Sequence, residues 1–284
     1  MSPPSPPSSI QQAREALGQR LREIRKDSGL TARAMAAAAG WHESKSSRLE
    51  NGRTPPSDTD IRTWTRICDA EDQTADLIAT ARGIDGMYVE WRRLESAGLK
   101  RVQESVLPLF ERTQRFRFYQ SWIVPGLLQT EDYTRAILHT VAAVRDTPGD
   151  ADEAVAARMD RQRVLYTGGR RFAFLMEEWV LRTVIGDSAT MMSQLGHLTG
   201  MTNTPSVSLG VIPMGVVRGN AWPCESFSLY DEKQASCELV SAGLTVKQPS
   251  QIAEYAKTFT DLAGIAVYGA AARTLITSAI DALG

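Results

Sequence analysis

The chain has 284 residues, of which 43% are hydrophobic and 23% are charged, and its formal net charge is −1. This length predicts one large or two ordinary domains, and the composition is typical of a soluble globular protein. A nearly neutral charge argues against nonspecific binding of polyanions by the whole molecule. The sequence contains no apolar run of the roughly 20 residues that a membrane-spanning helix needs, and its N-terminus lacks the features of a signal peptide.

Cysteine and histidine usage predicts no metal site, no cofactor and no disulfide framework. The cysteines are few, odd in number and without CxxC spacing: Cys68, Cys224 and Cys237. The histidines are too dispersed to form a ligand set: His42, His139 and His197. The cysteine pattern fits a reducing compartment, so we expect a cytoplasmic protein.

The N-terminal part predicts a short tail followed by an all-α domain. Residues 1–12 are rich in proline and serine and predict a disordered tail. Residues 13–82 carry the signals of five short helices. In the first helix, Leu17, Leu21 and Ile24 are spaced so that they line one face.

The next two helices are separated by a glycine turn. Gly29 ends the first helix and Thr31 offers its hydroxyl as an N-cap for the second. Gly40 makes the turn, and residues 42–50 predict a third short helix that ends at Asn51 and Gly52. A second helix joined to a third by such a turn is typical of a helix-turn-helix, in which the last helix lies in the DNA major groove.

Two further helices complete this predicted domain. Ser57 can cap a fourth helix that places Ile61 and Trp64 on one face. Residues 71–82 predict the fifth helix. Residues 83–98 are expected to be a connector to the rest of the chain.

An ordered set of turn, cap and core positions carries a family resemblance. These positions are Leu17-Gly18, Arg20-Leu21, Gly29-Leu30-Thr31, Ala36, Gly40, Ser47, Glu50, Asn51-Gly52-Arg53 and Pro55-Pro56. The set resembles the lambda repressor/Cro (XRE) family of DNA-binding domains, which implies a lambda-repressor-like fold that binds double-stranded operator DNA. Two positions depart from the family pattern, since Ala32 stands where glutamine is frequent and Ser46 stands where a buried aliphatic residue is usual.

The resemblance assigns roles to individual side chains of the predicted helix-turn-helix. Four residues are expected to face base edges: His42, Glu43, Ser44 and Arg48. Four are expected to contact phosphates: Thr31, Lys45, Arg53 and Thr54. Arg25 and Glu50 match a structural ion pair of the family, and the alternative for Arg48 is an exposed helix charge without a role. Between residues 13 and 57, nine basic and five acidic residues leave a charge of +4 to meet phosphates.

Residues 99–284 predict a second domain of mixed α/β type with a small sheet and a helical tail, which makes the whole chain α+β. The mixed aromatic and arginine residues at 101–119 favour a half-buried surface over a nucleic-acid surface. The remaining elements predicted are helices at 131–145, 151–165 and 188–201, strands at 172–177 and 206–213, a hairpin at 225–231 and 235–240, and helices from Ser250 onward.

Seven segments of this domain occur in an order that carries a second resemblance. They read PGLLQTEDY, RMDRQRVL, FLMEEWVLR, QLGHL, VSLGVIP, SAGLTVKQP and AVYGAAAR. In this order they resemble a family of actinobacterial regulators that join an XRE domain to a large C-terminal domain of undefined activity. The resemblance implies a cytoplasmic transcription factor, frequently encoded beside a small partner protein, and some members are described as antitoxin-like or developmental regulators.

The sequence therefore predicts a sequence-specific transcriptional regulator whose C-terminal domain forms a homodimer and senses a ligand or a small partner protein. The first alternative is an antitoxin-like protein that sequesters a small partner and regulates its own synthesis. The second is an enzyme acting on a small metabolite, which a pocket formed by Glu177, Arg182 and His197 would favour. No catalytic role is predicted for the adjacent carboxylates of Glu177 and Glu178.

One basic helix and several glycines have alternative interpretations. Arg158, Arg161 and Arg163 are suited to an acidic partner, but a solvated helix face is favoured. The glycines at 168–169 and 215–219 lack phosphate-loop spacing and predict turns.

Overall fold

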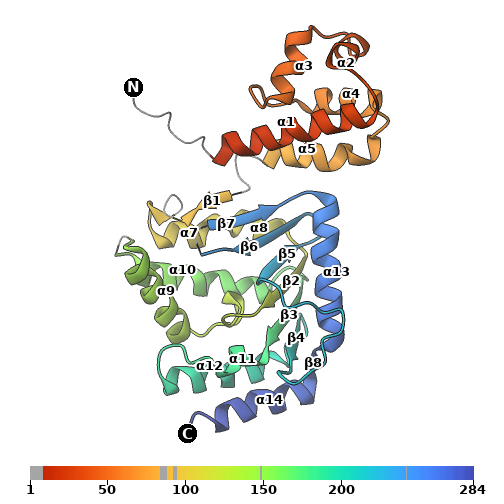
Figure 1. Ribbon diagram of the computed structural model, residues 1–284. Coiled ribbons are helices and arrows are strands. Elements are labelled where there is room, and N and C mark those ends of the chain that lie inside the picture. Colours follow the sequence, from red (N-terminus) through yellow and green to blue (C-terminus); the bar gives the residue numbers. More distant parts are fainter. Residues whose placement is uncertain (1–8, 84–87, 92–94, 148, 241) are drawn as a thin grey trace. The chain divides into compact units, whose positions relative to one another are not determined.

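The computed structural model describes residues 9–83, 88–91, 95–147, 149–240 and 242–284 (Figure 1). The chain forms two compact units, one of residues 1–88 with 245–252 and the other of residues 89–244 with 253–284. Residues 84–87 and 92–94 of the predicted connector, like residues 1–8 of the predicted tail, lie outside the described residues. The return of residues 245–252 to the first unit was not predicted.

The first unit contains the five predicted α-helices. They are α1 (Ser9–Asp27), α2 (Ala32–Ala38), α3 (Glu43–Glu50), α4 (Asp58–Ile67) and α5 (Thr74–Gly83), with a short 3₁₀ helix η1 (Glu71–Gln73) before α5. The helix α1 begins at Ser9, so the predicted disordered tail is wrong for residues 9–12. Glutamine and alanine at 11–13 are good helix formers and extend the pattern toward the N-terminus.

Side-chain caps fix where α2 and α4 begin. The Thr31 hydroxyl accepts a hydrogen bond from the Ala34 N–H at 3.1 Å. The Ser57 hydroxyl accepts from the Asp60 N–H, and the Asp60 carboxylate in turn accepts from the Ser57 N–H, both at 3.1 Å. This reciprocal capping box satisfies two backbone donors that a helix start leaves unpaired.

The core of the first unit is small and closely packed around Trp64. The side chain of Trp64 is fully buried, and its indole N–H donates to the Leu21 carbonyl at 3.0 Å. The helices α1 and α3 approach closely at Gly18, where an added Cβ would lie 2.6 Å from the Leu49 carbonyl oxygen. The position of α3 therefore depends on the absence of a side chain at Gly18.

The second unit is organised around one sheet. Among the described residues this sheet has eight strands in the order β1-β7-β6-β5-β2-β3-β4-β8. The strands are β1 (Tyr88–Glu90), β2 (Arg115–Gln120), β3 (Arg171–Glu177), β4 (Val207–Ile212), β5 (Phe227–Tyr230), β6 (Gln234–Glu238), β7 (Ala242–Val246) and β8 (Val267–Tyr268). The central strands β2, β3 and β4 are parallel, whereas β5 and β8 pair antiparallel with β2 and β4.

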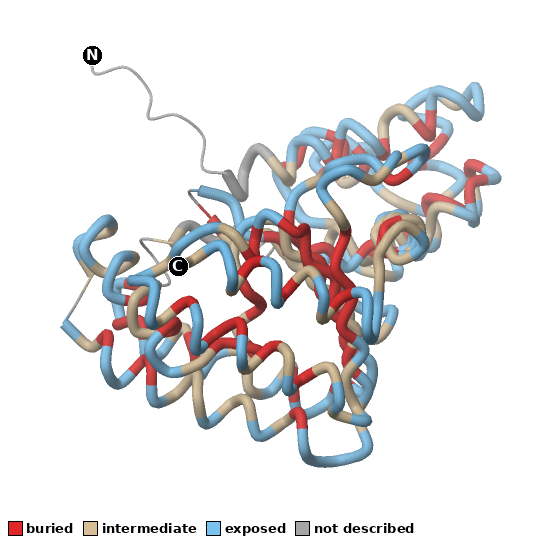
Figure 2. Tube along the Cα trace, turned by 90° about the horizontal axis from the view of Figure 1, so that it is seen from below, coloured by how far each residue is buried: buried red, intermediate tan, exposed pale blue. Residues whose placement is uncertain are grey.

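Helices cover both faces of this sheet. They are α7 (Leu99–Ser105), α8 (Leu107–Arg112), η2 (Gly126–Leu128), α9 (Glu131–Arg145), α10 (Ala151–Arg161), η3 (Gln162–Tyr166), α11 (Glu178–Arg182), α12 (Ser188–Met201), α13 (Pro249–Ile265) and α14 (Gly269–Asp281). One face, with Phe116 and Phe172 stacked at 4.6 Å, forms the main core with α8, α9, α11, α12 and α14. The helix α13 lies on the other face (Figure 1), and its Phe259 contacts Phe227 of β5. Figure 2 shows buried positions gathered in the interior and exposed positions along the outer turns of the helices.

The predicted α+β class is confirmed, but the sheet is larger than expected. The predicted strands at 172–177 and 206–213 and the hairpin are confirmed as β3, β4, β5 and β6. The strand β2 was not predicted, and β8 interrupts the predicted helical tail. Gly269 adopts φ +56 at that interruption, where it starts a new helix.

Candidate nucleic-acid interface

The helix α3 presents a polar face on one side and is anchored on the other. Its buried residues are Ser46, Leu49 and Glu50, which lie within one arc of the helix. At 3.6 residues per turn, the exposed residues occupy the opposite arc: Glu43, Ser44, Ser47, Arg48 and Asn51. This arc holds three of the four predicted base contacts and also Ser47, which was not predicted to contact bases.

His42 is the N-cap of α3, so the predicted helix begins one residue too early. Its Nδ1 accepts a hydrogen bond from the Ser44 N–H at 3.2 Å and lies 2.8 Å from the Ser44 hydroxyl. Because Nδ1 is used in capping, only Nε2 of the exposed ring remains to meet another molecule.

Glu43 and Arg48 differ in whether their side chains already form an ion pair. The Glu43 carboxylate lies 3.3 Å from Arg33 of α2, and both side chains are exposed, so this pair constrains them weakly. The Arg48 guanidinium is exposed and has no partner among the described residues. Its backbone carbonyl accepts from the N–H groups of Arg53 and Thr54, which orders the turn after α3.

The predicted phosphate contacts fall into two groups. Arg53 and Thr54 are exposed directly after α3. Thr31 uses its hydroxyl to cap α2. Lys45 donates to Asp60 at 2.5 Å and lies over the Trp41 ring at 4.3 Å, so its amino group is already engaged.

The hydrogen bond from Lys45 also affects the pKa of Asp60. Burial raises the pKa of the Asp60 carboxyl, but the hydrogen bonds from Lys45 and Ser57 outweigh burial, and the net pKa is lowered. Asp60 is therefore ionised in the folded domain and fixes the Lys45 side chain between α3 and α4.

A buried ion network anchors the back of α3. The Glu50 carboxylate accepts from Arg25 Nε at 2.5 Å and Nη2 at 3.1 Å, and from Arg22 Nε at 3.1 Å. Arg25 also donates to the Leu30 carbonyl at 2.7 Å. The hydrogen bond to Glu50 raises the pKa of Arg25, while burial opposes it. The contact expected between Arg25 and Glu50 is thus present, and Arg22 extends it.

Ser46 faces the core, as the departure from the family pattern implies. Its side chain is fully buried, and its hydroxyl has no hydrogen-bond partner among the described residues. An unpaired buried hydroxyl carries a desolvation cost that no bond offsets.

Among the described residues, no hydrogen bond or ion pair joins the three side chains that would favour an enzyme. Glu177 is fully buried, where its carboxylate accepts from the Tyr119 hydroxyl at 2.7 Å and from Arg218 at 2.8 and 3.1 Å. Arg182 instead binds Glu178 at 2.8 Å. Burial lowers the pKa of His197, which the structure does not link to either carboxylate by a hydrogen bond or ion pair among the described residues.

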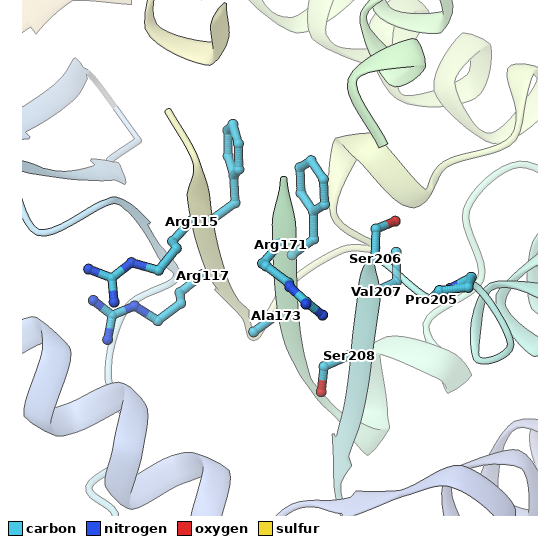
Figure 3. A pocket seen from close by; sticks show the side chains of 10 residues that line it. Arg115, Arg117, Arg171, Ala173, Pro205, Ser206, Val207 and Ser208 are labelled. Atoms are coloured by element: carbon cyan, nitrogen blue, oxygen red, sulfur yellow. The ribbon is translucent and has the colours of Figure 1, made fainter. Parts of the chain in front are cut away.

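A shallow pocket of about 290 Å³ lies at the start of the parallel strands (Figure 3). The side chains of Arg115, Arg117 and Arg171 border it. Glu232 lies 3.4 Å from Arg115 and 3.8 Å from Arg117, so part of this positive charge is already neutralised.

Comparison with known proteins identifies both parts of the chain. Residues 16–78 match the family model of a helix-turn-helix domain. Residues 104–278 match a domain of unknown function, DUF5753. Because this second match spans more than half of the chain, the protein belongs to the DUF5753 family, with a helix-turn-helix domain at its N-terminus.

Other comparisons add little. No curated protein matches the sequence. A structure described as "Structure of TrmBL2, an archaeal chromatin protein, shows a novel mode of DNA binding" is similar over 84% of this chain and 88% of its own, with 11% identity and a TM-score of 0.33. Similarity at that level supports no conclusion about this chain. Across the described residues, no helix is long and apolar enough to span a membrane.

Proposed function

We propose that this protein is a sequence-specific DNA-binding transcriptional regulator of the lambda repressor/Cro type, and that α3 is its recognition helix. The observation that carries the proposal is the two-sided character of α3. Its exposed arc is made of polar side chains, and its opposite side is held by the buried network around Glu50. A short helix fixed in this way meets the requirement that a recognition helix enter the major groove in one orientation.

Arg48 is the side chain best suited to direct readout. It is exposed and without a partner among the described residues, so its guanidinium can bind guanine O6 and N7 without first breaking an ion pair. Glu43 can accept from cytosine N4 only by competing with Arg33. The hydroxyls of Ser44 and Ser47 can contact several bases, and His42 can offer Nε2.

The predicted phosphate contacts differ in the hydrogen bonds and ion pairs that their side chains already form. Arg53 and Thr54 are exposed after α3 and can bind the backbone directly. Thr31 lies at the start of α2, where backbone N–H groups favour an anion. Lys45 reaches a phosphate only if it leaves Asp60.

DNA binding can be tested by selecting binding sites from a random duplex library and then measuring affinity by fluorescence anisotropy at fixed salt. Arg48→Ala should weaken binding to the selected site by about 1–3 kcal/mol and relax preference at one base pair. Arg66→Ala is the matched control. Arg66 is an exposed arginine in the last turn of α4, whereas Asp60 lies in the first turn of that helix. An unchanged preference in Arg48→Ala, or an equal loss in both variants, would refute the assignment.

We also infer that the C-terminal domain dimerises the protein, because one recognition helix reads only a half-site. The support is an apolar patch where the parallel strands end. Trp122 and Trp222 are 67% and 77% exposed, and Met214 is 56% exposed. The Trp179 indole donates to the Ser121 carbonyl, and the Met214 N–H donates to Glu178. Arg218 donates both to the Ala221 carbonyl, next to Trp222, and to Glu177, so these segments lie together. Exposed apolar patches of this kind mark interaction surfaces.

The dimer hypothesis is tested by sedimentation of the full chain. Trp122→Ser with Trp222→Ser should convert a dimer into a monomer, while Val240→Ser, at a 98% exposed position outside the patch, should not. A parent protein that sediments as a monomer would contradict dimerisation. The patch would then favour the second candidate, an antitoxin-like role in which it binds a small partner protein.

The remaining expectations rest on the family resemblance. We expect the protein to be a cytoplasmic regulator of actinobacterial type and not an enzyme. We expect its C-terminal domain to respond to a ligand or a partner protein. Co-expression with the products of neighbouring genes, followed by co-purification, tests the partner protein. Incubation of the purified protein with a metabolite extract tests for turnover.

A further inference from the structure

Two arginines of α10 form a half-buried basic pair that the predicted solvated helix face does not explain. Arg163 matches that interpretation, since it is 82% exposed and pairs with Asp160. Arg158 and Arg161, in contrast, are only partly exposed and point into the second unit. The prediction of a solvated face is therefore wrong for these two, because α10 turns this side toward α7 and the loop at η2.

Within the part of the chain that the structure describes, the groups that touch the pair are all neutral. Arg158 donates to the side-chain carbonyls of Gln103 at 3.0 Å and Gln129 at 2.9 Å. Arg161 donates to the Gln103 backbone carbonyl at 3.3 Å and lies over the Phe110 ring at 5.3 Å. Neither guanidinium forms an ion pair among the described residues. Two adjacent positive charges are thus held in the protein without a counter-charge, which is costly unless an anion completes the site.

Several donors of the pair also lack acceptors. The Nε of Arg161 is buried and has no hydrogen-bond partner among the described residues. A guanidinium carries five N–H donors in a planar fork that matches the oxygens of a carboxylate or phosphate. The protein supplies acceptors for only part of the two forks.

Titration behaviour agrees with this geometry. Burial, and to a lesser extent the nearby charge of Arg161, lowers the pKa of Arg158 to about 10. Burial also lowers the pKa of Arg161. The acidic group that acts on both is Glu238 of β6, an exposed residue outside ion-pair distance.

The sheet opposite the pair is polar. Tyr230 packs against Phe110 at 5.8 Å between ring centroids, which places it beside Arg161. Ser228 and Ser236 are directly paired in the sheet, two residues from Tyr230 and Glu238, and both keep part of their surface exposed. On the opposite face of the same strands, Phe227, Leu229 and Cys237 are buried. Hydroxyls on the arginine side are suited to the polar remainder of a ligand.

We propose that Arg158 and Arg161 form the anion-binding site of the DUF5753 domain, and that its ligand is a small molecule carrying a carboxylate or phosphate group. The two guanidinium forks bind the anionic group, and Tyr230, Ser228 and Ser236 face the rest of the molecule. This assignment does not depend on DNA binding by the N-terminal domain.

Isothermal titration of the full chain tests the site with two probes, inorganic phosphate and malonate, at ionic strength held constant with sodium chloride. One of them should bind saturably, and the preference between them identifies the anion class. Arg158→Gln and Arg161→Gln should each bind at least about tenfold more weakly, since a charge-assisted hydrogen bond to the anion is lost. Arg163→Gln, in the 3₁₀ helix η3 that directly follows α10, is the matched control and should bind like the parent.

Melting temperatures, measured with and without the anion, test the site even if a variant shows no binding in the titration. In anion-free buffer, Arg161→Gln should melt at or above the temperature of the parent, because it removes one of two like charges. The probe that binds should raise the melting temperature of the parent but not of Arg161→Gln. Absence of saturation for both probes in the parent, equal affinity in Arg161→Gln and Arg163→Gln, or a marked loss of stability in anion-free Arg161→Gln would each overturn the site.

Discussion

Replacement of Glu50 by alanine is the most informative change to the first unit. It removes the carboxylate that accepts three hydrogen bonds from Arg25 and Arg22, and it leaves the buried Arg25 with only the Leu30 carbonyl. Breaking a buried pair in this way costs about 3–5 kcal/mol. At an m-value of about 2 kcal/mol/M, a loss of about 4 kcal/mol moves the urea midpoint by about 2 M.

The assay is urea unfolding of the full chain labelled with 5-fluorotryptophan and followed by ¹⁹F NMR. The resonance of Trp64, whose indole donates to Leu21, reports on this unit alone. Glu23→Ala is the matched control, because Glu23 pairs with Arg20 at the surface, and it should cost less than about 1 kcal/mol. Replacing both Arg25 and Glu50 by apolar residues should recover much of the loss. Equal midpoints for Glu50→Ala and Glu23→Ala would refute the reasoning.

Three further predictions concern the same unit. Ser46→Ala should stabilise it by about 1 kcal/mol, measured as a higher melting temperature, because a buried unpaired hydroxyl is removed and alanine favours helix; a lower melting temperature would contradict the burial argument. Gly18→Ala should destabilise it by about 1–3 kcal/mol in urea unfolding despite better helix propensity, since the new Cβ meets the Leu49 carbonyl; no loss would show that α1 moves freely. The ionised Asp60 carboxylate stabilises the fold above its unfolded pKa of about 3.9, and this stabilisation is lost as the pH falls through the lower pKa of the folded state. Asp60→Asn should therefore reduce the loss of unfolding free energy that the parent shows at acidic pH. An unchanged loss at acidic pH would exclude the contact with Lys45 as its source.

Sequence signals that act within one or two turns predicted the first unit well. Thr31 and Ser57 are caps because their hydroxyls satisfy N–H groups three residues away, which is a local requirement. Gly29 and Gly40 adopt the left-handed conformation that their turns need. The capping role of His42 was missed because histidine is not among the preferred N-cap residues. The role of Arg22 was missed because it depends on the distance between α1 and α3.

Prediction of the second unit was weaker because its contacts are distant in sequence. The alternation RFRFYQ at 115–120 is the period of a strand, but the mixed arginines and aromatics suggested a surface. The alternating residues lie on the two faces of β2, with Phe116 in the core and Arg115 at the pocket. The burial of Arg158 and Arg161 could not be predicted from a helical pattern alone, because it is set by where α7 and η2 lie.

The strand pairing of the second unit also has a consequence for protein synthesis. Phe116 pairs with Tyr230, and Gly210 pairs with Tyr268, so both flanks of the parallel strands are completed late in translation. Until β8 leaves the ribosome, β4 is an unpaired hydrophobic edge, which is prone to aggregate. The core of the first unit is made of residues between 13 and 81, so its helices can pack while the nascent chain is still growing. We therefore expect nascent chains of this protein to need chaperone protection at β4, and to lose that need once residues 267–268 have emerged.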